Sequence, residues 1–233
     1  MTVVLVAHGS PDPRHRRGLA GLVEATATAL APERVTIAYL EHDEPSPEAV
    51  ASRLAPGERV TLVPLLLTPA YHARVDIPAA AATLDSEGAY VTVTASLGPD
   101  PALLDAAAEL VRPGPVILVA GGSSDGSALH GLRAQLAADP GRTDWHAAAL
   151  SDRKGLDDLI TRLRLRHDQV TLAPFTLAEG VLSDRVREVA AAHGMRSVAG
   201  ELARTEAVRD LVLRRVWESR TLAPRYDPAE DRT

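Results

Sequence analysis

Short apolar runs alternate along this chain with longer stretches in which apolar residues recur at the spacing of an amphipathic helix. In the first part of the sequence, the runs cover residues 3–7, 35–40, 60–67 and 90–95. Compact apolar runs of this kind, bounded by Gly, Pro or Ser, indicate buried strands. The stretches between them indicate helices at about 17–30 and 48–54, the second with Ser46 as N-cap, then one after Pro78 and one ending near residue 111. This alternation predicts an α/β fold with a parallel sheet covered on both faces.

The same pattern then starts again. Residues 116–123 (VILVAGGS) resemble residues 3–10 (VVLVAHGS), and residues 170–174 (VTLAP) resemble residues 60–64 (VTLVP). Residues 202–216 take the place of residues 97–110. We therefore predict a duplication with two flavodoxin-like halves, each holding a four-stranded parallel sheet of order 2-1-3-4. The predicted boundaries are 1–112 for the first half, 113–222 for the second half and 223–233 for a polar tail.

Composition narrows the classes of function. The 233 residues have a formal net charge of −6, only 3% aromatic residues and no cysteine. The charge and the few aromatics argue against a nucleic-acid partner. Without cysteine, a metal must be held by nitrogen or oxygen ligands. The sequence contains no apolar run long enough to span a bilayer and no basic leader before the first strand, so we expect no membrane partner and a cytoplasmic location.

Three chemically distinctive residues follow the first three predicted strands. The first strand is followed by His8, the second by Glu41, and the third leads into a loop with His72. Ligands of open parallel sheets bind beyond the carboxyl ends of the strands, and the order 2-1-3-4 makes these three strands neighbours. Two imidazoles and a carboxylate suit a divalent ion such as Co(II), Fe(II), Ni(II) or Zn(II), and they are also bases near neutral pH. The convergence of the three, more than any one of them, predicts a site.

The second half provides an internal contrast. There, Gly121 takes the place of His8, Ser151 that of Glu41 and Leu182 that of His72. The second half thus repeats the scaffold without the ligands. This comparison predicts one active half and one supporting half.

Three segments resemble those of a known family. Residues 5–10 (LVAHGS), residues 39–41 (YLE) with 44–46 (EPS), and residues 64–78 (PLLLTPAYHARVDIP) are similar to the sirohydrochlorin chelatases, the class II chelatases of the CbiX type. The resemblance is strong in the N-terminal half and extends to the C-terminal half mainly as a scaffold. It implies a chelatase-like fold and a lyase that inserts Co(II) or Fe(II) into sirohydrochlorin without ATP, in cobalamin or sirohaem biosynthesis.

The resemblance also implies roles for individual residues. His8 and His72 match the metal-binding catalytic histidines, and Glu41 matches a carboxylate assigned to the site in some members. Pro11 stands where the family often has arginine, which affects how a substrate carboxylate is held. These ligands do not distinguish cobalt from iron as the metal substrate, and Ni(II) or Zn(II) can also be accepted in vitro.

A tetrapyrrole rich in carboxylates needs cations and backbone donors. We expect these from the N–H groups of Gly9 and Ser10 and from the side chains of Arg14 and Arg74. Further candidates lie close to them in sequence: Arg16 and Arg17 after the first loop, Asp76 to orient His72 or to cap the next helix, and His42 beside Glu41.

Two other functions fit parts of the sequence. Residues 122–126 match the G-x-S-x-G pattern of serine hydrolases, with Ser124 as nucleophile and Asp152 or Asp184 and His193 as partners. A non-catalytic metal or tetrapyrrole carrier would use the same ligands as a chelatase. Neither G-x-G-x-x-G nor a Walker lysine motif occurs, so we expect no nucleotide cofactor. A duplicated chain can act as a monomer with pseudo-dimeric halves or as a weak homo-oligomer.

Overall fold

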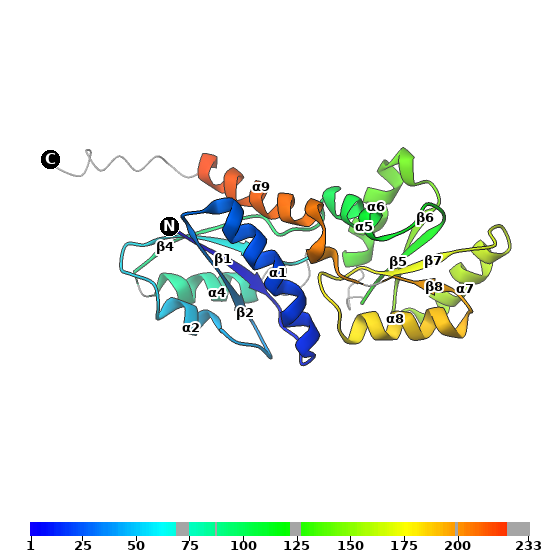
Figure 1. Cartoon of the computed structure of the whole chain (residues 1–233), viewed down its shortest axis with the longest axis horizontal. Coiled ribbons are helices and arrows are strands. Elements are labelled where there is room, and N and C mark those ends of the chain that lie inside the picture. Colours follow the sequence, from blue (N-terminus) through cyan, green and yellow to red (C-terminus); the bar gives the residue numbers. More distant parts are fainter. Residues whose placement is uncertain (69–74, 87, 122–126, 199, 223–233) are drawn as a thin grey trace.

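The computed structural model describes residues 1–68, 75–86, 88–121, 127–198 and 200–222. Its first half contains a parallel sheet of order β2-β1-β3-β4 (Figure 1). The strands are β1 (Thr2–Ala7), β2 (Arg34–Tyr39), β3 (Arg59–Pro64) and β4 (Tyr90–Val93). All six residues of β1 are buried, as expected of a central strand covered on both faces. The predicted strand order is confirmed.

Helices follow these strands, and side chains cap the first turns of two of them. They are α1 (Pro13–Leu30), α2 (Pro47–Ala51), α4 (Asp76–Asp85) and α5 (Ala102–Leu110). The Ser46 side chain accepts a hydrogen bond from the Ala49 N–H, which confirms the predicted N-cap. Helix α1 begins before the predicted start near Arg17, because the Asp12 carboxylate caps it by accepting from the Arg14 N–H.

The second half repeats this arrangement. Its sheet has the order β6-β5-β7-β8, with β5 (Val116–Ala120), β6 (Trp145–Ala149), β7 (Thr171–Pro174) and β8 (Arg196–Ser197). Its helical elements are α6 (Ser127–Ala138), η1 (Pro140–Arg142), α7 (Arg153–Arg164), α8 (Val181–Ala192) and η2 (Leu202–Arg204). None of the helices in the described ranges combines the length and apolarity that a membrane span needs.

The final helix returns to the first half. Helix α9 (Glu206–Leu222) contacts α1, α5 and β3, and Figure 1 shows it lying over the first half. Helix α5 in turn reaches the second half, where Asp105 forms an ion pair of 2.6 Å with Arg142. One apolar cluster includes residues of β1, α5, β5 and α9. The boundary at residue 112 stays a prediction, because the helices on either side of it share this core.

Candidate functional site

His8 lies where the buried strand β1 leaves the sheet. The pairing of β1 with β2 places Ala7 opposite Tyr39 and continues beyond both strands, since the Glu41 N–H donates to the His8 carbonyl over 2.8 Å. Next to it, Gly9 has a φ of +93°, and a Cβ built there would lie 1.8 Å from the Glu41 carbonyl oxygen. The loops after β1 and β2 are therefore in direct backbone contact, and this contact carries the half-buried His8 toward Glu41.

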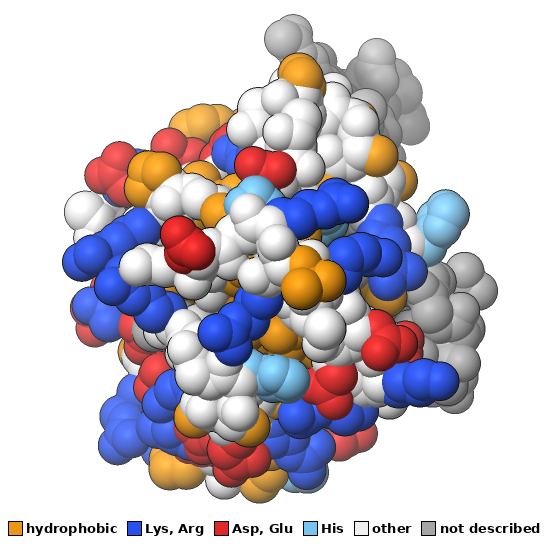
Figure 2. All heavy atoms as spheres, turned by 90° about the vertical axis from the view of Figure 1, so that its right-hand side faces the viewer, with side chains coloured by type: hydrophobic (Ala, Val, Ile, Leu, Met, Phe, Trp, Pro, Cys, Tyr) orange, Lys and Arg blue, Asp and Glu red, His pale blue; other side chains and the backbone are white. Residues whose placement is uncertain are grey.

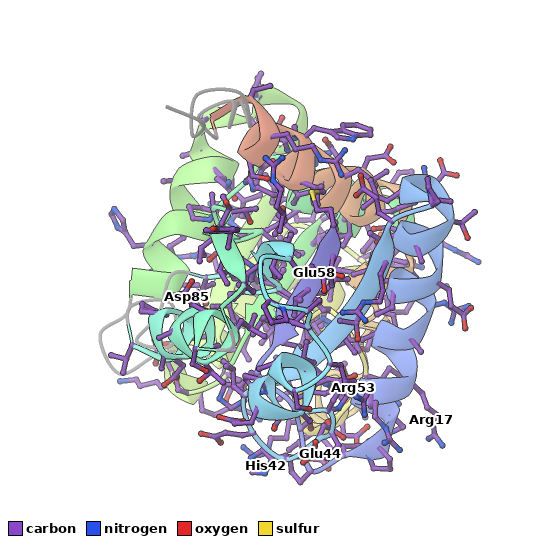
Figure 3. The ribbon with its side chains drawn as sticks, turned by 90° about the vertical axis from the view of Figure 1, so that its left-hand side faces the viewer. Arg17, His42, Glu44, Arg53, Glu58 and Asp85 are labelled. Atoms are coloured by element: carbon purple, nitrogen blue, oxygen red, sulfur yellow. The ribbon has the colours of Figure 1, made fainter. Side chains whose placement is uncertain are left out.

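Glu41 and His42 place a carboxylate and a second imidazole beside His8. The His42 Nε2 atom lies 3.4 Å from Glu41 Oε2, and the rings of His8 and His42 are 6.5 Å apart between centroids. His42 has a φ of 65°, which is uncommon for a residue with a side chain. Figure 3 shows His42 and Glu44 at one end of the first sheet, with Glu58 at the other. The structure thus places His8 and Glu41 on adjoining loops, with the His42 ring beside them, and the convergence of their side chains on a metal stays a prediction.

Asp43 holds the two loops together. Its carboxylate accepts a hydrogen bond of 3.2 Å from the Ser10 N–H, and its side chain is only 10% exposed. Arg16 lies 4.0 Å from the other carboxylate oxygen. We expected the Ser10 N–H to be available to a substrate carboxylate, and here it is donated to Asp43. Sequence analysis missed Asp43, because the partner of a loop carboxylate is set by contacts between strands.

Arg14 is engaged within the protein. Its Nη2 atom lies 2.5 Å from Asp12 and 2.5 Å from Asp184, which belongs to α8 of the second half. The Arg14 hydrogen bonds lower the pKa of Asp12 to about 2, and they also lower the pKa of Asp184. The charge of Arg14 is therefore balanced by two carboxylates. Arg17, by contrast, points outward from α1 in Figure 3 and forms no ion pair in the described part of the chain.

His15 is a half-buried imidazole on α1. Its Nδ1 atom is buried and has no hydrogen-bond partner among the described residues. Burial lowers the pKa of His15, and the neighbouring His8 lowers this pKa further. The negative charge of Asp43 acts in the opposite direction and raises it. A signal was present in the sequence, since His15 continues the buried stripe of Leu19, Leu22 and Thr26 on α1.

Glu41 also faces α4. A cavity of about 200 Å³ is lined by Glu41, Glu48 and Asp76 together with residues of α2 and α4. The predicted residues His72 and Arg74 lie outside the described residues, as does Ser124. Within the described ranges, no three His, Asp or Glu side chains form a metal-binding group. The complete ligand set with His72 therefore stays a prediction.

The residues proposed for a serine hydrolase are engaged elsewhere. Asp152 caps α7 by accepting from the Gly155 N–H, and Asp184 binds Arg14. His193 ends α8, where Gly194 has a φ of +61° as the helix-ending motif predicts, and it lies 3.0 Å from Asp157. Each of the three proposed partners of Ser124 is thus bound to another group in the described part of the chain.

The internal duplication has the predicted register. Ala120 pairs with Ala149 as Ala7 pairs with Tyr39, so Ser151 follows its strand by the same step as Glu41. Gly121 follows β5 directly, as His8 follows β1. The position equivalent to His8 has no side chain, so the described part of the second half lacks a counterpart of the site.

Comparison with known proteins supports the resemblance. The model of the CbiX family matches residues 2–113, a range that contains His8, Glu41 and His72. This half of the chain is therefore similar to the CbiX family. No curated protein is similar enough in sequence to count as a match.

Solved structures share the fold over both halves of the chain. SirB from Bacillus subtilis with Fe3+ is 21% identical, with a TM-score of 0.74 and 94% of each chain covered. The sirohydrochlorin chelatase SirB from Bacillus subtilis subspecies spizizenii in complex with cobalt is also 21% identical, with a TM-score of 0.72 and 94% of each chain covered. CbiX, described as the terminal enzyme of sirohaem biosynthesis in denitrifying bacteria, is 18% identical with a TM-score of 0.63, covering 94% of this chain and 99% of that one.

Proposed function

We propose that this protein is a sirohydrochlorin chelatase that inserts Co(II) or Fe(II) into the tetrapyrrole without a nucleotide. The observation that carries the proposal is the CbiX match, which spans the segments of His8, Glu41 and His72. The arrangement of His8, Glu41 and His42 at the carboxyl edge of the first sheet supports it. Cobalt and iron in the SirB structures support these two metals as substrates.

The metal ion is a substrate and must be released to the ring. In the proposal, His8, His72 and Glu41 hold the ion, while water or the ring fills its other positions. A set of three nitrogen and oxygen ligands positions the ion without enclosing it. As the ion forms bonds to the ring nitrogens, two protons leave the ring. One of the site imidazoles or Glu41 accepts them and passes them to water.

Other residues of the first half would position the ring. Arg17 and Arg74 are the cations that we propose for substrate carboxylates, with the N–H of Gly9 as a backbone donor. We assign Arg14 a supporting part, because it is bound to Asp12 and Asp184 and these contacts fix the loop that carries His8. We further propose a cytoplasmic monomer in which the two halves form a pseudo-dimer, since one apolar cluster joins them.

The test is an anaerobic absorbance assay with purified protein, sirohydrochlorin and either Co(II) or Fe(II). We expect faster spectral change than in the protein-free control, with many turnovers, and loss of the acceleration in His8→Ala and His72→Ala. His130→Ala, an exposed histidine of α6, serves as the control and keeps full activity. Stoichiometric binding of metal or ring without turnover would contradict the proposal and indicate a carrier.

A further inference from the structure

A cavity of about 530 Å³ runs along the edge strand β6 of the second half, away from the residues of the proposed metal site. Its walls are the end of α6, the segment of η1 and one face of α7. Its apolar lining includes Leu136, Leu159 and the ring of Trp145. A cavity of this size holds a small organic molecule.

The cations of this cavity outnumber its anions. Arg133, Arg142, Arg162 and His146 line it, and Asp139 is the one acidic residue among the lining residues described. Arg142 is balanced by Asp139 and Asp105, and it lies over the Trp145 ring at 5.4 Å. Arg142 therefore closes the cavity at Trp145 and brings no unbalanced charge.

Arg133 and Arg162 remain without an acidic partner in the described part of the chain. Arg133 uses its Nε–H for a hydrogen bond of 3.2 Å to the Ala147 carbonyl, which leaves its two terminal nitrogens available. Arg162 forms no ion pair, although Asp158 lies one helical turn before it. Figure 2 shows Lys and Arg side chains spread over this end of the molecule, with His side chains between them.

The field inside the cavity is positive at His146. Burial lowers the pKa of His146, the charge of Arg162 lowers it further, and Asp144 opposes the shift. Arg133 and Arg162 are like charges that line the same cavity, and a bound anion would balance both. Guanidinium groups bind carboxylate and phosphate in a bidentate manner.

From this geometry we infer a second ligand site: the cavity beside β6 binds a small organic dianion with a flat apolar body, through Arg133 and Arg162. The two cations set the charge of the ligand. The half-buried ring of Trp145 favours an apolar body between the two acidic groups. The inference is independent of the proposed chelatase reaction, since it uses no residue of the first half.

Arg133 also has a structural role that the test must separate from ligand binding. Its bond to Ala147 covers part of the open edge of β6, and exposed edge strands are commonly protected in this way. This role does not involve Arg162 or the apolar lining. Arg162→Gln is therefore the decisive variant.

The experiment follows Trp145 fluorescence in a Trp217→Phe background, which removes the only other tryptophan. Isophthalate serves as the probe with an apolar body, and inorganic phosphate as the dianion without one. We expect isophthalate to change the emission with a dissociation constant below about 1 mM and to bind more tightly than phosphate. Arg162→Gln and Arg133→Gln should each weaken binding about tenfold or more.

Arg166→Gln is the matched control, because it removes the same charge from a residue near α7 that does not line the cavity. It should leave isophthalate binding within a factor of about two to three of the parent protein. Absence of isophthalate binding would overturn the inference, and so would equal binding by the Arg162→Gln protein. Phosphate binding as tight as that of isophthalate would overturn the assignment of an apolar ligand body.

Discussion

At the scale of single residues, Gly9 shows how tightly the proposed metal site is built. Its φ is +93°, and a Cβ added at this position would lie 1.8 Å from the Glu41 carbonyl oxygen, so there is no space for a side chain. We predict that Gly9→Ala pushes the loops of His8 and Glu41 apart. It should lower the free energy of unfolding by about 2 kcal/mol or more and abolish most of the insertion activity.

Gly57→Ala is the control for backbone strain alone. Gly57 also has a positive φ, +79°, but a Cβ added there would meet nothing within 4 Å. Replacement of Gly57 by Ala should lower the free energy of unfolding by about 1–2 kcal/mol. The insertion activity at ordinary temperature should remain unchanged. Urea denaturation and the absorbance assay measure the two effects. Equal activity of the two variants would show that the Gly9 contact does not matter for the site.

Protonation of His146 makes the stability of the second half depend on pH. Burial and the charge of Arg162 lower its pKa below the usual 6.5, and His167 lowers it further. Asp144 has the opposite effect and raises the pKa. Because the folded state disfavours the protonated ring, its stabilising contribution is complete above pH 6.5 and is lost as the pH falls through the lowered pKa. NMR titration of the ring should give a midpoint below 6.5, and isophthalate should raise it. A midpoint at or above 6.5 without ligand would contradict the assigned environment.

At the scale of elements, the N-terminus of α8 is tied to the loop of His8 by Arg14. The ion pairs of Arg14 with Asp12 and Asp184 are screened by solvent, so each contributes little to stability. We predict that Asp184→Asn leaves the melting temperature nearly unchanged and lowers kcat severalfold, because the loop of His8 loses a fixed point. Arg153→Gln, which breaks the exposed pair with Asp157, is the control and should retain full activity. An unchanged kcat in Asp184→Asn would exclude this positioning role.

Helix α9 ties down the loop after β4. Arg215 binds Asp100 over 2.8 Å and donates to the Ser96 carbonyl, and both side chains of the pair are about nine-tenths buried. In the same loop, a Cβ at Gly98 would lie 1.8 Å from the Leu67 carbonyl, just before the segment with His72. Helix α9 thus supports the loop after β4, as α8 supports the loop of His8.

Removing Arg215 takes away the buried partner of Asp100 and leaves this buried carboxylate with the more exposed Arg214 alone. We predict that Arg215→Met lowers the free energy of unfolding by about 3–5 kcal/mol. Arg214→Met, at the more exposed partner of the same Asp100, should cost less than about 1 kcal/mol. Chemical denaturation of the two variants provides the measurement, and similar losses would contradict the predicted difference.

The strands, their order and the duplication could be predicted, but the docking of α9 and the ion pairs between distant residues could not. Apolar runs and the internal repeat indicated the strands and the duplication through local periodicity, and the flavodoxin-like fold class supplied the strand order. The face that α9 covers depends on which of two similar sheets it meets, and its own pattern does not encode this. Likewise, Asp184 lies 170 residues from Arg14, so nothing in the sequence near Arg14 indicates its partner. At the site, the strand order predicted that Glu41 and His8 follow neighbouring strands. The partly buried setting of His15 becomes clear only when the residues of α1 are placed on a helix with its buried face known.

At the scale of the whole molecule, each half contributes a helix that packs against the other half. Helix α5 of the first half reaches the second half, and α9 of the second half packs on α1 and β3. Five apolar residues of α9 are buried, namely Val208, Leu211, Val212, Leu213 and Val216. Burial of each such side chain contributes about 1.5–3 kcal/mol. Together they match the entire free energy of unfolding of a small domain, about 5–15 kcal/mol.

The shared core predicts that the first half cannot fold alone, although it holds the proposed metal ligands. A fragment of residues 1–112 loses α9, so the apolar surfaces of α1 and β3 become exposed to water. We expect its circular dichroism to show no cooperative thermal transition and its insertion activity to be absent. Addition of a fragment of residues 113–222 should restore both, whereas the intact chain ending at residue 222 should behave like the full protein. A cooperative, active monomer of residues 1–112 would show that the second half is dispensable and that α9 only covers a site that is already formed.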